Sequence, residues 1–262
     1  MSILIDGSSD YVDIDYSAKW ILNPASDEIS ISYWAKVSAY PSSPDTYQLY
    51  FQINEAGAYK ITLMSYYHTD YHLIYGIFIR DSDWVPVGYL TWMNDVTPFP
   101  TANTWNHVVV NTTVVGANSR LYFNKVSYGV APIIVWSSVG AIDPHEIFIS
   151  DGAGLSGTFN IAHFAVVKDM LTVPEIDQHY KDPYSCLTNP DIIGYFPMLE
   201  SLGVMRDKAP GPTNGTLSGA TWDVGDDPLL GWANKEINDI DIVYPDKISG
   251  FRTGQIRKVS GV

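Results

Sequence analysis

Short segments with apolar side chains at alternate positions recur along the first 170 residues, and turn-forming residues separate them. Alternation puts successive side chains on opposite faces of a strand, so each segment predicts a strand with one apolar face. The segments are Ile3–Ile5, Tyr11–Ile14, Ile29–Val37, Tyr47–Ile53, Tyr59–Met64, Leu73–Arg80, Trp105–Thr112, Arg120–Phe123, Glu146–Ile149 and Phe159–Val167. Because each apolar face must be covered, the pattern predicts an all-β chain with two antiparallel sheets packed face to face.

One short helix is expected after the last of these strands. Thr172 is a capping residue type, Pro174 fits the first helical turn, and Glu175 completes a Thr-x-x-Glu capping box. Asp182-Pro183 ends the helix, since the residue before proline is disfavoured in helical conformation.

Composition limits the classes of binding partner and the cellular compartment that we expect for this protein. The formal net charge of −14 argues against nucleic acid, because phosphate binding requires a basic surface. Cys186 is the single cysteine, so no intramolecular disulfide can form. The first residues lack a basic and then apolar leader, and no apolar run reaches the length of a membrane span. We therefore expect synthesis in a cytoplasm and no membrane insertion.

Four stretches carry a resemblance to a known superfamily. They are LIDGSSDYVDI (Leu4–Ile14), EISISYWAKV (Glu28–Val37), the pair TWNHVVVNTT and SRLYFNKV (Thr104–Val126), and GTFNIAHFAVVKDMLTVPEIDQHYKDP (Gly157–Pro183). In this order they resemble the laminin-G-like, concanavalin A-like lectin/glucanase superfamily. The resemblance implies a two-sheet antiparallel jelly-roll sandwich, and we expect Trp34, Trp105, Val108 and Val110 to fill the space between the sheets. The polar stretch from Gly225 to Val262 predicts an extended C-terminal arm.

A fifth stretch stands in an unusual place. Ile192–Trp222 resembles the family segment that normally precedes the Asp-Gly strand, whereas here it follows the helix. We expect Ile192–Leu199 to pair beside Leu4–Ile14, because an unfilled strand position would leave an open edge. The predicted organisation is a laminin-G-like sandwich over residues 1–183, a segment over 184–224 that completes it, and an arm over 225–262.

The carboxylates do not form a hydrolase pattern. Retaining glycosidases on this fold need an acid and a nucleophile close together, and the nearest string here is Glu175-Ile-Asp177. That string lies on the predicted helix, where Glu175 is expected to cap. We therefore predict a non-enzyme without a catalytic residue.

Two groups of residues are candidates for ligand and metal contact. The densest aromatic and polar cluster comprises Tyr66, Tyr67, His68, Asp70, Tyr71, His72, Trp84 and Trp92. Such a cluster suits sugar binding, and equally suits packing against a neighbouring subunit. No cofactor is expected, although calcium could bind the turns at Asp6, Asp10 and Asp151 if their oxygens do not simply bond the backbone. His107, His145, His163 and His179 fall on different elements and suggest no shared metal site.

These features favour a virion protein of a tailed bacteriophage, a head decoration or tail-associated subunit with capacity for surface glycans. The stretch that follows the helix, Tyr180–Tyr184, resembles phage-encoded laminin-G-like proteins. A stand-alone lectin is the alternative, and a glucanase-like hydrolase is a third. The expected partners are other subunits of the same particle, in a homo-oligomer.

The chain end predicts an assembly arm. Its cations are Lys247, Arg252, Arg257 and Lys258, no acid follows Asp246, and the rest of the chain has a charge of −18, since −14 minus +4 is −18. Ile248, Phe251 and Ile256 would serve as apolar anchors on a neighbouring subunit. Deleting residues 246–262 should leave the melting temperature of the sandwich nearly unchanged while abolishing oligomer formation in light scattering. A truncated protein that still assembles would contradict this.

Overall fold

The computed structural model describes most of the first 228 residues, which form one of two compact units. The described ranges are 1–7, 10–23, 26–44, 46–55, 60–69, 72–81, 86–93, 99–112, 119–130, 141–144, 146–150, 158–198, 204–211, 213–224 and 226–228. The second unit, Leu229–Val262, holds all seven residues named for the arm and lies outside these ranges. The arm therefore stays a prediction.

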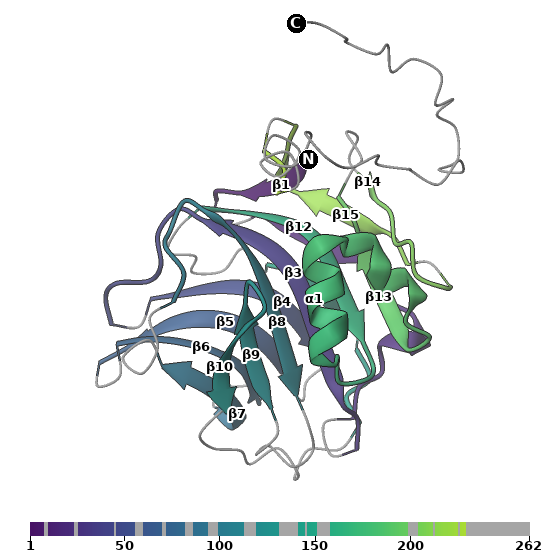
Figure 1. Cartoon of the computed structure of the whole chain (residues 1–262), viewed down its shortest axis with the longest axis horizontal. Coiled ribbons are helices and arrows are strands. Elements are labelled where there is room, and N and C mark those ends of the chain that lie inside the picture. The colour runs from purple at the N-terminus through teal and green to yellow at the C-terminus, as the bar shows by residue number, and fades with distance from the viewer. Residues whose placement is uncertain are drawn as a thin grey trace, which may run out of the picture. The chain divides into compact units, whose positions relative to one another are not determined.

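The strands of the described ranges form two antiparallel sheets of eight strands each. Sheet A has the order β10-β9-β8-β3-β12-β1-β16, with β13 also paired to β12 (Figure 1). Its strands are β1 (Ser2–Ile5), β3 (Ile29–Val37), β8 (Trp105–Thr112), β9 (Arg120–Phe123), β10 (Val126–Val130), β12 (Phe159–Val167), β13 (Ile192–Phe196) and β16 (Thr221–Asp223). The two-sheet all-β prediction is confirmed.

Sheet B has the order β14-β15-β2-β11-β4-β5-β6-β7. Its strands are β2 (Tyr11–Ile14), β4 (Tyr47–Asn54), β5 (Lys60–His68), β6 (His72–Arg80), β7 (Pro86–Met93), β11 (Glu146–Ile149), β14 (Val204–Met205) and β15 (Gly215–Ser218). Strand β7 was not expected from the sequence. Its Gly88 and Pro86 interrupt the β-branched pattern on which the expectation rested.

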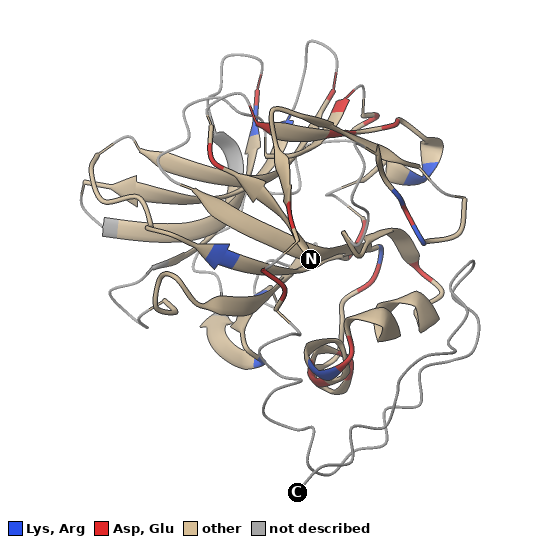
Figure 2. Cartoon of the chain, turned by 90° about the horizontal axis from the view of Figure 1, so that it is seen from above, with Lys and Arg blue, Asp and Glu red and all other residues tan. Residues whose placement is uncertain are grey.

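The main core lies between the sheets and is rich in aromatic rings. Tyr33 of sheet A lies 5.8 Å from Tyr50 of sheet B and 6.0 Å from Phe164, measured between ring centroids. Tyr50 in turn stacks on Tyr75 at 5.4 Å and meets Phe159 edge-on at 5.3 Å. Charged residues are drawn mainly at strand ends, in loops and on the helix, as Figure 2 shows. These interlocking rings hold the two sheets face to face.

Two tryptophans do not lie where the sequence analysis placed them. Val108 and Val110 are in the core between the sheets, as expected. Trp34 is buried on the outer face of sheet A, because its neighbours Tyr33 and Ala35 are the residues that face the core. Trp105 also lies on that outer face, where its Nε1 donates to Asp226 at 2.8 Å. The phase of the alternation was therefore misassigned for both indoles.

The outer face of sheet A is covered by α1 (Val173–Lys181) and the 3₁₀ helix η3 (Pro183–Thr188), as Figure 1 shows. A second apolar cluster fills the space beneath them, with Val109, Val167, Ile176, Cys186 and Tyr195 among its members. Among the described residues, no helix has the length and apolarity that crossing a bilayer demands.

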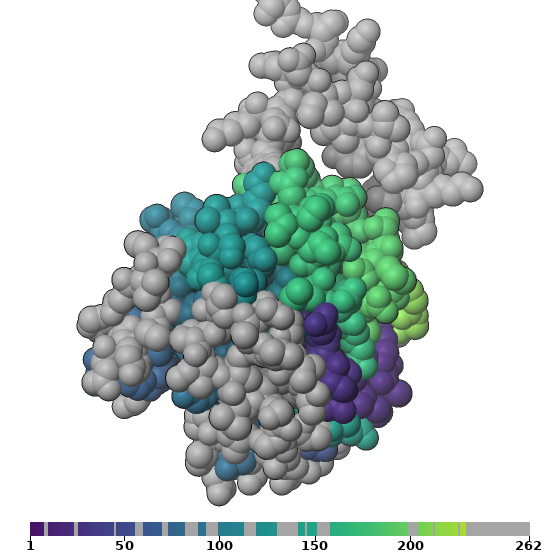
Figure 3. All heavy atoms as spheres, turned by 60° about the horizontal axis from the view of Figure 1, so that its bottom comes forward, coloured from purple at the N-terminus to yellow at the C-terminus, as the bar shows by residue number. Residues whose placement is uncertain are grey.

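Residues beyond the helix supply strands to both sheets. Gly215–Ser218 pairs with β2, and Thr221–Asp223 pairs with β1. Figure 3 shows the purple N-terminal residues beside the green and yellow-green ones from beyond residue 160. The partner expected for Ile192–Leu199 was wrong: β13 pairs with residues 164–167 of β12 instead of with the Leu4–Ile14 region.

A buried carboxylate ties this returning segment to the start of the chain. Asp207 accepts hydrogen bonds from the backbone N–H groups of Tyr195, Ala209 and Thr213, at 2.9, 2.9 and 3.2 Å. Its Oδ2 also receives the Nζ of Lys19 at 2.6 Å. Lys19 belongs to the 3₁₀ helix η1 (Ala18–Trp20), so one carboxylate joins η1, β13 and the loop after β14.

The indole of Trp20 packs into the same junction. Its Nε1 donates to the hydroxyl of Thr213 at 3.1 Å, and its ring stacks on Phe196 at 6.4 Å. Only glycine fits at position 194, because a Cβ there would approach the Trp20 ring to 2.6 Å. Packing and hydrogen bonding therefore both fix β13 against η1.

Replacing Asp207 with alanine should lower the free energy of unfolding by about 3–5 kcal/mol, since it leaves a lysine and several buried N–H groups without an acceptor. Asp177→Ala is the matched control, because Asp177 also binds lysines but lies exposed on α1. Urea denaturation of both variants checks this. Equal losses in the two variants would contradict the assigned role of Asp207.

Candidate functional site

An apolar and aromatic strip lies on the outer face of sheet B, on strands β4 to β7. Leu49, Met64 and Phe78 form a buried cluster, and Tyr47 and Tyr66 pack against it. The ring of Tyr89 lies 6.4 Å from that of Phe78, and Tyr89 is 38% exposed. We call these six residues the aromatic strip.

Strand register explains why these side chains meet. Tyr47 lies opposite Tyr66, Leu49 opposite Met64, and Phe78 opposite Tyr89. Directly opposite residues of antiparallel strands point to the same face, with Cβ atoms about 5 Å apart. The strip is thus a property of four paired strands and not of one loop.

A cation is held at the edge of the strip. The guanidinium carbon of Arg80 lies 5.3 Å from the centroid of the Phe78 ring, and Nη2 lies 3.5 Å from the sulfur of Met64. Burial lowers the pKa of Arg80, whose ordinary value is so high that the group stays charged. The strip therefore combines ring faces with a positioned hydrogen-bond donor, the two kinds of group that sugar sites use.

The structure brings part of the predicted ligand cluster to this strip. Tyr66 belongs to it, and the ring of His68 meets Tyr66 edge-on at 6.1 Å. Tyr67 is half-buried at the end of β5, and His72 opens β6 opposite His68. Asp70, Tyr71 and Trp84 lie outside the described residues.

Among the described residues of that cluster, Trp92 and Tyr67 lie away from the strip, Tyr67 because it follows Tyr66 on β5 and successive side chains point to opposite faces. The indole of Trp92 is 3% exposed in the core between the sheets, and its Nε1 donates to the carbonyl oxygen of Gly129 at 3.1 Å. Nearness in sequence suggested a shared surface, but Trp92 faces inward while its neighbour Tyr89, three positions earlier, faces outward. Tyr47, Phe78 and Tyr89 were missed, and only the strand register could have identified them.

Asp6 and Asp10 lie together in the turn after β1. Asp10 is buried, and its Oδ2 accepts the N–H groups of Asp6 and Gly7 at 3.0 and 2.7 Å. A hydrogen bond with the Asp10 side chain raises the pKa of Asp6. Asp151 lies outside the described residues, and the ranges that are described contain no cluster of metal-ligating side chains. Asp10 thus acts as the acceptor that closes this turn.

Glu175 caps its helix, as predicted. Its Oε2 accepts from the N–H and the hydroxyl of Thr172 at 2.8 and 2.6 Å, and these hydrogen bonds lower the pKa of Glu175. Asp177 binds Lys125 and Lys181 at 2.8 and 2.6 Å. The two carboxylates of this string are thereby occupied in stabilising α1.

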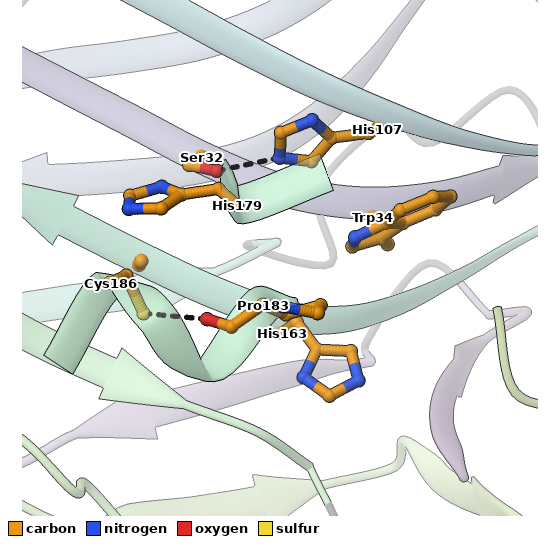
Figure 4. A pocket seen from close by; sticks show the side chains of 8 residues that line it. Ser32, Trp34, His107, His163, His179, Pro183 and Cys186 are labelled. Carbon is orange, nitrogen blue, oxygen red and sulfur yellow. Dashed lines mark hydrogen bonds between the residues drawn. The ribbon is translucent and has the colours of Figure 1, made fainter. Parts of the chain in front are cut away.

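Three of the histidines that the sequence scattered meet at one small cavity beneath α1 and η3 (Figure 4). His107 comes from β8, His163 from β12 and His179 from α1, and Cys186 and Trp34 complete the lining with Ser32, Ala165 and Pro183. Their meeting was not expected from the sequence, because it depends on β8 and β12 flanking β3 and on α1 packing over them.

Comparison with known proteins supports the fold. No protein-family model matches the chain, and no curated protein matches it. Among solved structures, a Bacteroides ovatus protein described provisionally as carbohydrate-binding is 14% identical and has a TM-score of 0.56. The alignment covers 84% of this chain and 59% of that protein, so the chain spans less than two thirds of its length.

Two toxin domains are more distant. The receptor-binding domain of botulinum neurotoxin D is 13% identical, with a TM-score of 0.48 over 68% of this chain and 43% of that one. The binding domain of Paraclostridial Mosquitocidal Protein 1 is also 13% identical, with a TM-score of 0.48 over 68% of this chain and 42% of that one. The match to the Bacteroides ovatus protein shows a shared β-sandwich fold, and at 14% identity it shows nothing of a ligand.

Replacing Asp10 with alanine should lower the free energy of unfolding by about 1–3 kcal/mol, because two backbone N–H groups lose their acceptor. Asp10→Asn should cost less, since its amide oxygen can still accept. Both losses should be the same with and without calcium in thermal melts. A calcium-dependent rise in the melting temperature of the wild type, absent from Asp10→Ala, would instead identify a calcium site.

Proposed function

We propose that the chain is a non-enzymatic glycan-recognition subunit that binds sugars on the aromatic strip of sheet B. The observation that carries this proposal is the strip itself, with ring faces from Tyr47, Tyr66 and Tyr89 around an apolar centre. Sugar rings present C–H groups on one face, and these pack on aromatic rings while hydroxyl groups meet polar side chains at the rim.

The two outer faces of the sandwich differ in a way that supports this choice. On sheet A the outer face is closed by α1 and η3, with apolar side chains beneath them. On sheet B none of the described helices contributes to the cluster around Phe78, and Tyr89 retains an exposed ring. Sheet B is therefore the face with aromatic surface available to a ligand.

The likeness in fold to the Bacteroides ovatus protein is compatible with glycan binding and adds no residue-level support. The absence of enzymatic activity is part of the proposal, supported by the capping role of Glu175 and by the ion pairs of Asp177.

The assembly that carries this subunit is proposed to be the particle of a tailed bacteriophage. What supports it is the resemblance of the helix and the residues after it to phage-encoded laminin-G-like proteins, and the fold fits a free lectin equally well. A mass-spectrometric inventory of purified particles separates the two: presence supports the virion subunit, and absence from particles made by cells that express the chain supports the lectin.

On a glycan array the full chain should bind a defined set of sugars. In calorimetry, Tyr89→Ala and Tyr66→Ala should each lower the affinity for the best of these sugars about tenfold, because each loses about 1.4 kcal/mol of ring contact. Tyr16→Ala is the matched control, since Tyr16 is an exposed tyrosine that contacts Asp143 instead of the strip. The array glycans should be recovered intact. Equal weakening by Tyr16→Ala, or no binding to any glycan, would contradict the proposal.

A further inference from the structure

The cavity beneath α1 and η3 is lined by imidazoles whose hydrogen bonding is incomplete. His107 Nε2 lies 2.9 Å from the hydroxyl of Ser32, and His163 Nδ1 lies 3.0 Å from that of Tyr195. The other nitrogen of each ring, His107 Nδ1 and His163 Nε2, is buried without a hydrogen-bond partner among the described residues, and so is Nδ1 of His179. The cavity has room for about one water molecule, which would need two to four polar partners of this kind.

All three rings are shielded from solvent. His107 is 1% exposed, His163 2% and His179 4%. Two of them come from the sheet and the third from the cover, so the cavity exists only while α1 lies on sheet A (Figure 4). The ring of Tyr180 on α1 adds to this contact by stacking on Trp34 at 5.4 Å.

Burial makes the charged form of each ring unfavourable. It lowers the pKa of His107 to about 3, with His179 and His163 adding repulsion, and lowers that of His163 to about 4. It also lowers the pKa of His179, although less than full burial would, because Glu175 and Asp182 favour the cation. All three imidazoles are thus neutral under the closed cover at neutral pH.

We propose that α1 and η3 form an acid-released cover, held on sheet A at neutral pH and detached in mild acid when the three histidines of the cavity take up protons. Three imidazolium groups cannot share a cavity of this size, because each would lack solvation and would repel the others. An exposed histidine has an ordinary pKa near 6.5, so the proton favours the open state below that pH.

Proton linkage determines whether acid stabilises or destabilises the closed state. Between the pKa values of the open and closed states, the open state binds more protons, so the closed state loses stability as the pH falls. Each strongly shielded histidine raises the opening constant roughly thirtyfold at pH 5 relative to neutral pH, and two of them give on the order of a thousandfold.

Other ionisable groups lie near the cavity on the elements that pack there. On the cover, Glu175 and Asp182 favour the charged form of His179. In the segment after β16, Asp227 pairs with the N-terminal amine; Asp227 raises the pKa of His163 and the amine lowers it. Cys186 and Tyr195 also face this region, and burial raises the pKa of each, so both stay neutral across the range. The carboxylates titrate at lower pH than an open histidine, which separates their effect from that of the cavity.

Cys186 provides the measurement, because it is the single thiol of the chain and is 1% exposed on η3, where it lines the cavity between the cover and sheet A. Its rate of reaction with 4,4′-dithiodipyridine, a reagent that works in acid, is compared at each pH with the rate in fully denatured protein. The protection of Cys186 should fall on the order of a thousandfold between neutral pH and pH 5. Near-ultraviolet circular dichroism should show the sandwich still folded.

The test variant combines three replacements that keep the existing hydrogen bonds. His107→Gln places an amide where Nε2 meets Ser32, and His179→Gln is a neutral substitute on α1. His163→Asn places an amide where Nδ1 meets Tyr195, and asparagine also tolerates the positive φ of 50° at this position. His68→Gln, on sheet B and outside the cavity, is the matched control.

The triple variant should retain protection across the range, while His68→Gln should lose it as the wild type does. Should the triple variant fold poorly, the three single variants are compared. His107→Gln and His163→Asn should each flatten the pH dependence by about one proton, and His179→Gln by less. Constant protection of the wild type, or an unchanged pH dependence in the histidine variants, would overturn the proposal.

Discussion

The bulge in strand β12 at His163 is the constraint around which sheet A is arranged. On one edge of β12, residues 159–161 pair with β1 and residues 164–167 pair with β13, and the pairing with β3 on the other edge shifts between Ala162 and Ala165. His163 takes a left-handed conformation there, which costs a non-glycine residue about 1–3 kcal/mol. The bulge thus separates the part of β12 that pairs with β1 from the part that pairs with β13, and turns an imidazole toward the cover.

The outer faces of the two sheets differ in structure. Outside sheet A, α1 and the 3₁₀ helix η3 cover a second apolar cluster and a small cavity lined by three histidines. Outside sheet B, the strands themselves present Tyr47, Tyr66 and Tyr89 around Phe78. A ligand on the aromatic strip and a proton in the cavity would therefore act on opposite faces of one shared core.

The architecture could be predicted because it rests on local pattern: alternation marked ten strands, and Thr172 with Glu175 marked the helix. The pairing register between strands that are distant in sequence could not be predicted from local pattern. The outward phase of Trp34, the inward position of Trp92 and the partner of β13 depend on contacts between separate strands. Trp34 lies opposite His107, Trp92 bonds Gly129, and β13 pairs with β12 beside its bulge. The same limit hid the histidine cavity, whereas Tyr66 was found because it lies in an aromatic run that continues onto the strip.

The strand order determines when, during translation, each strand of the sandwich can pair with its partners. Strands β1 and β2 leave the ribosome first, yet their partners are β12, β16, β11 and β15. The nascent chain must therefore hold both strands unpaired until β11 and β12 emerge, and their second partners, β15 and β16, follow only after residue 214. Pairings so distant in sequence slow folding and leave strand edges open to other chains. Slower translation at low temperature, or a chaperone that shields the first strands, should raise the soluble yield of this protein.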